Sequence, residues 1–226
     1  MPRLLGEIMG CQACTPGAGS GRQALHDGVA LFTQYMSAER IGAIAYDGAD
    51  PADDPQWRLS GARTRAEYAL WCRHCCGMAC LQMVLDHRDG HAPPLLELLH
   101  GCRAYGGYVE NADGQIKGLY YAPFADYVRA EHRLHADVHP HLAAAELPGL
   151  LADGHLVMAS VHWEIRRPDL PAPGRGGHLV LITGHEHGLI HLHNPSGHTP
   201  GARRASLPMD VFESFFAGRG IALRMR

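Results

Sequence analysis

The sequence predicts an α+β fold in which a group of helices precedes a small antiparallel sheet. Between residues 64 and 151, apolar residues recur every three or four positions, which is typical of buried helices. From residue 156 onward, short apolar runs alternate with glycine-containing turns, which indicates β-hairpins. Because helical and strand segments do not alternate along the chain, parallel βαβ units are not expected.

The chain has 226 residues, of which 46% are hydrophobic, enough for one large domain with a sizeable core. We divide it into an N-terminal extension of unassigned role, residues 1–60, and a main domain, residues 61–226. The net charge of −3 and the lack of a basic run argue against nucleic acid as a partner. We find no secretory signal and no membrane span, and the seven crowded cysteines do not resemble a disulfide framework. A cytoplasmic protein without a membrane partner is therefore expected.

The helical half is organised around a central helix over residues 77–87. Ala79, Met83 and Val84 lie on one face and Leu81 and Leu85 on another, so this helix should be buried. Further helices are expected over residues 29–35, 64–71, 95–105, 123–132 and 141–151. Residues 41–46 are predicted to form a strand, and residues 47–55, with four aspartates and two prolines, a surface loop.

The second half should contain strands over residues 156–163, 178–183, 189–193 and 221–225, with a last helix over 209–216. Residues 166–177 contain three prolines and three glycines, so we expect a long loop before the strand that begins at His178.

Cys76 stands at the predicted start of the central helix. Unpaired backbone N–H groups and the positive end of the helix dipole favour a thiolate there, which is the nucleophilic form of cysteine. A cysteine in an apolar helix can also be a small buried hydrophobic residue. Cys75 is an alternative nucleophile, but Gly77 immediately after Cys76 favours Cys76.

A hairpin in the second half supplies a histidine and an asparagine. If Gly184 pairs with Gly188, His178 lies opposite Asn194 at the open end of an apolar face. Directly opposed side chains have Cβ atoms about 4.5–5.5 Å apart, close enough for a hydrogen bond. A histidine held in this way could act as general base and then general acid for a catalytic cysteine. A strand end and a simple turn are the alternative interpretation.

Three blocks of sequence resemble papain-superfamily cysteine peptidases, in particular the family related to bacteriocin-processing, double-glycine leader peptidases. They are Cys76-Gly77-Met78-Ala79 with its apolar helix, Gly177-His178-Leu179-Val180 followed by Gly184, and His193-Asn194-Pro195. The resemblance implies a papain-like fold: a helical lobe over about 61–152, with a buried nucleophile helix packed on a small antiparallel β lobe over about 153–226. It further implies a catalytic triad of Cys76, His178 and Asn194 that acts on a peptide or acyl/amide substrate through an acyl-enzyme, without a cofactor.

One departure from that family affects the oxyanion hole. The family usually carries glutamine six residues before the nucleophile, where this sequence has Leu70. The Cys76 backbone N–H, the Trp71 indole N–H and the Arg73 side chain are the candidate donors. Three functions remain open: a thiol hydrolase, an acyl or peptidyl transferase of specialised metabolism using the same triad, and a catalytically silent papain-like binding module.

Other cysteines and histidines allow metal or redox alternatives. Cys11-x-x-Cys14 and Cys72-x-x-Cys75 together could form a four-thiolate zinc site, and either pair could form a redox disulfide. His185, His187, His191 and His193 could bind a metal ion. We instead expect His191 and His193 to lie on a solvated face opposite His178.

Overall fold

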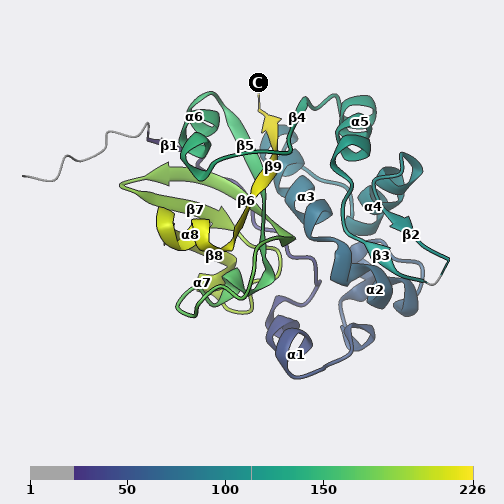
Figure 1. Ribbon diagram of the computed structural model, residues 1–226. Coiled ribbons are helices and arrows are strands. Elements are labelled where there is room, and N and C mark those ends of the chain that lie inside the picture. The colour runs from purple at the N-terminus through teal and green to yellow at the C-terminus, as the bar shows by residue number, and fades with distance from the viewer. Residues whose placement is uncertain (1–22, 113, 226) are drawn as a thin grey trace, which may run out of the picture.

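The computed structural model describes residues 23–112 and 114–225. Its helical part and its sheet lie side by side, and helix α3 lies between them (Figure 1). The structure therefore confirms the predicted α+β organisation, with helices before the sheet along most of the chain.

Most of the helices precede the long strands of the sheet. Their bounds are α1 (Ile41–Tyr46), α2 (Arg65–Trp71), α3 (Cys76–Asp89), α4 (Leu95–Ala104), α5 (Tyr121–His132), α6 (Leu147–Ala152), α7 (Pro200–Arg203) and α8 (Met209–Phe215). Helix α2 begins with a reciprocal cap, because the Thr64 side chain accepts from the Glu67 N–H and the Glu67 carboxylate accepts from the Arg63 N–H. Helix α3 ends at Gly90, whose φ of 77° is readily adopted by glycine.

The main sheet is antiparallel and has the strand order β4-β9-β5-β6-β7-β8, with β1 paired to β6. Its strands are β1 (Ala24–Leu25), β4 (Ala136–His139), β5 (His155–His162), β6 (Gly177–Glu186), β7 (Leu189–His193), β8 (Arg204–Pro208) and β9 (Phe216–Arg224). A separate ribbon of β2 (Val109–Glu110) and β3 (Ile116–Lys117) lies beside the helical part.

The two faces of the sheet bury two hydrophobic clusters. Leu179 and Leu181 of β6 belong to the cluster that contains Met78, Leu81 and most of helices α3–α5. Their neighbours along β6, Val180 and Ile182, belong to the cluster on the opposite face, which includes residues of α6 and α8. This alternation is the period of two that a strand imposes on its side chains. It fixes α3 against one face of the sheet.

Three predictions for the N-terminal part are wrong. Residues 41–46 form helix α1 rather than a strand, because Ile41 and Ile44, three positions apart, are both buried on one helical face. No helix forms over residues 29–35, where the chain is irregular and bends at residues 34–35. The loop over residues 47–55 is not wholly at the surface, since Asp54 is fully buried.

The predicted helix over residues 141–151 is shorter in the structure. Pro148 stands in the first turn of α6, where a proline is readily accommodated, and residues 144–146 form a 3₁₀ turn before it. The remaining predicted helices and strands lie where the sequence places them, with ends that differ by a few residues.

The N-terminal segment packs against the main domain. Tyr35, Ile41 and Trp57 form a small cluster with Tyr68 and Cys72 of the helical part. The proposed domain boundary near residue 60 stays a prediction.

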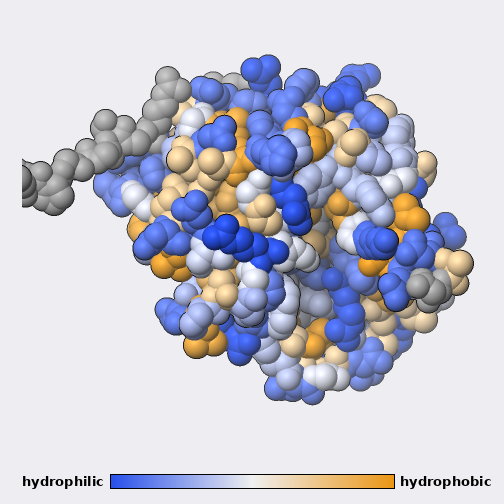
Figure 2. Space-filling view, viewed as in Figure 1, coloured by the Kyte–Doolittle hydropathy of each residue, from blue (hydrophilic) through white to orange (hydrophobic). Residues whose placement is uncertain are grey.

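Within the described ranges, no helix combines the length and the apolar character that a membrane crossing requires. On the face seen in Figure 2, hydrophobic residues form small groups between polar ones.

Candidate active site

Cys76 is the first residue of α3, as predicted, and is half-buried. The N–H groups of Gly77 and of Cys76 itself lie close enough to the sulfur to stabilise a negative charge, and the Leu179 N–H of β6 does the same from the sheet. The sulfur therefore lies between the helix start and β6, the strand that carries His178.

A groove runs past Cys76 and His178 in two parts. One part, with a volume of about 380 Å³, is lined by Leu119, Tyr120 and Tyr121 in addition to these two residues. The other, of about 360 Å³, extends past Gln34, Arg73 and Arg166. Cys76 and His178 line both parts, so a chain lying along the groove would pass over them.

The imidazole of His178 is held by two neighbours from the segment after β7. Its Nε2 lies 2.9 Å from Asn194 Oδ1 and 3.1 Å from Ser196 Oγ. Asn194 is fully buried and its Oδ1 also accepts the Ser196 N–H at 3.0 Å. A proton on Nε2 leaves Nδ1 as the acceptor nitrogen. Nδ1 makes no hydrogen bond within the described residues, so it is available to the thiol.

The hairpin register differs from the prediction, although the predicted pair forms. Leu181 pairs with His193 and Ile182 with Leu192, which moves the partner of each residue by two positions from the predicted register. The turn lies between Glu186 and Leu189, which displaces the register next to it by three positions, and a bulge between Ile182 and Gly184 reduces the displacement to two. Because a shift of two keeps every side chain on its own face, His178 still reaches Asn194 diagonally. The shift also places Ser196 beside the ring, which the sequence did not indicate.

Burial controls the protonation of both reacting groups. It raises the pKa of the Cys76 thiol above the usual value, although the nearby N–H groups act in the opposite direction. It also lowers the pKa of His178 to about 4, despite the hydrogen bond to Asn194, which acts to raise it. The resting site therefore holds a neutral thiol and a neutral imidazole, whereas the helix start alone suggested a thiolate.

The sequence has no glutamine at position 70, but the structure places another glutamine, Gln34, in the groove. It is buried, lines the groove with Cys76 and His178, and donates from Nε2 to the Cys72 carbonyl at 2.8 Å. Its backbone N–H donates to the Pro195 carbonyl at 3.0 Å, which ties it to the loop after Asn194. An amide nitrogen carries two hydrogens, so a second donor remains available.

Of the two side chains that the sequence suggested as oxyanion donors, Trp71 and Arg73, only Arg73 lines the groove. The ring of Trp71 packs against Tyr108 and His74 and under the Arg103 guanidinium, and it lines neither part of the groove. Arg73 does line the groove. Leu70, in the position where the family carries glutamine, is largely exposed.

The remaining cysteines of the described chain are inaccessible. Cys75, the alternative nucleophile, has no exposed surface, and burial raises its pKa well above the usual value. Cys72 is equally buried, with a pKa raised to about 12 for the same reason. Cys11 and Cys14 lie outside the described residues, so the zinc and redox alternatives stay predictions. Within the described residues, no cluster of three or more potential ligands could hold a metal ion.

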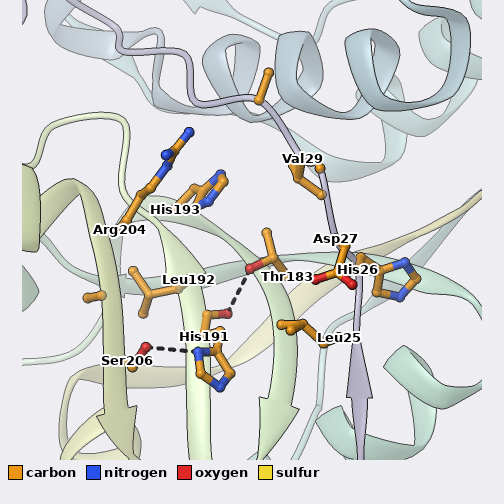
Figure 3. Close-up of a pocket in the computed structure, with 13 residues that line it drawn as sticks. Leu25, His26, Asp27, Val29, Thr183, His191, Leu192, His193, Arg204 and Ser206 are labelled. Atoms are coloured by element: carbon orange, nitrogen blue, oxygen red, sulfur yellow. Dashed lines mark hydrogen bonds between the residues drawn. The ribbon is translucent and has the colours of Figure 1, made fainter.

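A second cavity, of about 420 Å³, lies between the segment after β1 and strands β6–β8 (Figure 3). His193 and Arg204 point toward that segment, and His191 Nδ1 contacts Ser206 Oγ at 2.8 Å. The expectation that His193 faces solvent is wrong, because residues 26–30 cover it and leave it 9% exposed. None of Cys76, His178 and Asn194 lines this cavity.

Comparison with solved structures identifies the fold. A protein described as a C39-like peptidase from Bacillus anthracis matches with a TM-score of 0.55 at 12% identity, over 90% of this chain and 98% of its own. The peptidase domain of Streptococcus ComA, a bifunctional ABC transporter, matches with a TM-score of 0.45 at 13% identity, over 67% of this chain and 92% of its own. A double-glycine-motif protease from an AMS/PCAT transporter, solved in complex with the leader peptide, matches with a TM-score of 0.41 at 20% identity. The match covers 66% of this chain and 81% of that protein.

No protein-family model matches the sequence, and neither does any curated protein. The likeness to the Bacillus anthracis protein confirms the predicted papain-like fold. At 12% identity this likeness shows the fold and not the activity.

Proposed function

We propose that this protein is a cysteine hydrolase that cleaves a peptide or amide bond, with Cys76 as nucleophile, His178 as general base and acid, and Asn194 as the residue that orients His178. The observation that supports this most directly is the meeting, in one groove, of a half-buried cysteine at a helix start and a histidine hydrogen-bonded to a buried asparagine. Peptides are the proposed substrate class, as for the neighbour solved with its leader peptide.

The chemistry proceeds in two steps. His178 Nδ1 takes the thiol proton as the Cys76 sulfur attacks the substrate carbonyl, and the same proton then passes to the leaving amine. The product of this step is a thioester. Water, deprotonated by His178, attacks the thioester, releases the carboxylic acid and restores the thiol.

Gln34 and the Cys76 backbone N–H are the proposed donors to the oxyanion that forms at each attack. The absence of a glutamine at position 70, together with the unassigned N-terminal extension, motivates the transferase alternative. With Gln34 in the groove, hydrolysis needs no other donor. Transfer to an amine remains the second candidate, because the same thioester would serve it.

The first test is alkylation by iodoacetamide at pH 8, with mass spectrometry to locate the label. We expect Cys76 to be the principal labelled site in the described chain and its rate to fall at least tenfold in His178→Ala, since the general base is lost. Cys75→Ala should label as the wild type does. Labelling of Cys76 that does not depend on His178 would contradict the proposed pair.

The second test separates hydrolysis from transfer. A peptide mixture is incubated in ¹⁸O-labelled water with and without an added amine, and new termini are identified by mass spectrometry. Hydrolysis places ¹⁸O in the new carboxylate, whereas transfer gives an unlabelled amide. Both products should be absent from Cys76→Ala. Cleavage that persists in this variant would exclude Cys76 as nucleophile.

A further inference from the structure

The part of the groove beside Gln34 has an unbalanced positive charge. Arg73 and Arg166 both line it, together with Tyr35 and Trp163, and no aspartate or glutamate among the described residues does so. Neither guanidinium forms an ion pair with any group in the described ranges. The cavity that Cys76 and His178 line thus also contains the two cationic side chains, and neither has an anionic partner among the described residues.

Arg166 is the unusual member of the pair, because it is only 8% exposed. Its Nε donates to the Trp163 carbonyl at 2.9 Å, and its guanidinium lies 5.0 Å from the Trp163 ring and 5.6 Å from the Tyr46 ring. These contacts hold the group in place but do not neutralise it. Burying a charge without a counter-ion costs free energy, so a buried guanidinium is normally paired with an anionic group. A bound ligand can supply that group.

The nearest carboxylate is already paired. Glu164 Oε2 lies 2.6 Å from both Nε and Nη2 of Arg167, whereas it forms no ion pair with Arg166 and acts on that guanidinium only at longer range. The Glu164 carboxylate is therefore paired with Arg167 and not with Arg166.

The two arginines do not act on the thiol. The pKa of Cys76 is shifted by burial and by backbone N–H groups, and neither arginine contributes. Arg166 does act on His178, where its charge adds to burial in lowering the pKa. Both guanidinium groups thus line the part of the groove that also contains Cys76 and His178, where a neighbouring part of a bound substrate could meet them.

We propose that Arg73 and Arg166 form a subsite that binds a carboxylate of the peptide substrate, next to the bond that Cys76 attacks. This inference rests on the proposed function. Guanidinium groups bind carboxylates through paired, charge-assisted hydrogen bonds, which suits a planar anionic group. The carboxylate comes from the C-terminus of the substrate or from an acidic side chain, and the chemistry of recognition is the same for both.

The test uses alkylating reagents that carry the carboxylate one glycine unit, about 3.5 Å of extended chain, beyond the reacting group. N-iodoacetylglycine offers an α-carboxylate, and N-iodoacetylglycinamide is its neutral counterpart. N-iodoacetyl-aspartic acid α-amide and its asparagine analogue form the matched pair for a side-chain carboxylate. The alkylation rate of Cys76 is measured at pH 8 with each reagent and divided by the rate with free cysteine.

We expect at least one carboxylate reagent to alkylate Cys76 about 10- to 100-fold faster than its neutral counterpart, which is the range of a charge-assisted hydrogen bond. Arg73→Gln and Arg166→Gln should each reduce this preference, and Arg166→Lys should retain part of it. Arg58→Gln, which changes an exposed arginine stacked on Trp57 outside the groove, should leave the preference unchanged. Arg73 is exposed, so its variant keeps the test valid if Arg166→Gln does not fold.

The outcomes separate the subsite from the proposed function. A preference for the glycine reagent assigns the subsite to a chain terminus, and a preference for the aspartate reagent assigns it to an acidic side chain. Fast, His178-dependent labelling by the neutral reagents with no carboxylate preference would overturn the subsite alone. Slow labelling by all four reagents, independent of His178, would instead contradict the proposed nucleophile.

Discussion

In the proposed mechanism, the imidazole of His178 determines how Cys76 is activated. Asn194 and Ser196 hold its Nε2, which leaves Nδ1 toward the reaction. Because burial raises the thiol pKa and lowers that of His178 to about 4, the proton stays on sulfur at rest. The cysteine then becomes a thiolate only as the attack begins, by transfer to the neighbouring base.

This arrangement predicts a particular pH dependence. From about pH 5 to 8 His178 is a neutral base beside a neutral thiol, so the alkylation rate should be nearly constant there and should rise only as pH approaches the raised thiol pKa. Hydrolysis should be lost on the acid side near pH 4, where His178 becomes protonated. Rates are measured by quenched labelling and by peptide cleavage. An alkylation rate that rises about tenfold per pH unit from pH 6, equally in the wild type and in His178→Ala, would instead show that free thiolate reacts without His178 as base.

Gln34 is the proposed side-chain donor to the oxyanion, so its removal should affect hydrolysis. Gln34→Ala should lower kcat/KM for peptide hydrolysis by about 100- to 1000-fold, the usual cost of losing one oxyanion donor. Iodoacetamide alkylation of Cys76 should be nearly unchanged, because displacement of iodide creates no oxyanion. Gln56→Ala, an exposed glutamine, is the control. An equal loss in both reactions would mean that Gln34 supports the groove rather than the reaction.

At the scale of elements, the sequence predicted most where one face of an element is buried. The central helix α3 and strands β5–β7 followed from their apolar periods, and the His178–Asn194 pair formed although the register was wrong. The bulge near Thr183 could not be seen in the sequence, since nothing marks an extra residue in an apolar strand. The pair nevertheless formed because the turn and the bulge together shift the register by an even number of residues, which keeps each side chain on its face.

The N-terminal segment shows where such reasoning fails. Gln34 precedes Cys76 by 42 positions in the sequence and is placed by hydrogen bonds to Cys72 and Pro195 rather than by any local pattern. The residues around it form no regular element, so neither helical nor strand periodicity pointed to it. Arg166 was expected at the start of a long loop, whereas the structure places it at the end of a 3₁₀ turn, buried beside the Trp163 ring and lining the groove.

At the scale of the whole molecule, Asp54 connects the segment that carries Gln34 to the helical part. Its carboxylate accepts hydrogen bonds from Ser37 Oγ, the Ser37 N–H, Tyr68 Oη and the Gln56 N–H. Burial acts to raise the pKa of Asp54, but these hydrogen bonds outweigh it and hold the pKa below the usual value. Tyr68 also accepts the Met36 N–H at 2.9 Å, which extends the connection toward the groove.

Asp54→Ala should therefore lower the free energy of unfolding by about 2–4 kcal/mol, because it leaves the buried Ser37 and Tyr68 hydroxyls without their acceptor. The measurement is urea denaturation, with the exposed Asp53→Ala as control. The depressed native pKa fixes the pH dependence: the stabilisation by the carboxylate is complete above its unfolded pKa, about 3.9, and disappears as pH falls through the native value. The stability difference between the wild type and Asp54→Asn should accordingly shrink between pH 7 and pH 3. If Asp54→Ala reduced hydrolysis without changing the unfolding free energy, Asp54 would act on the groove alone and would not hold the two parts of the chain together.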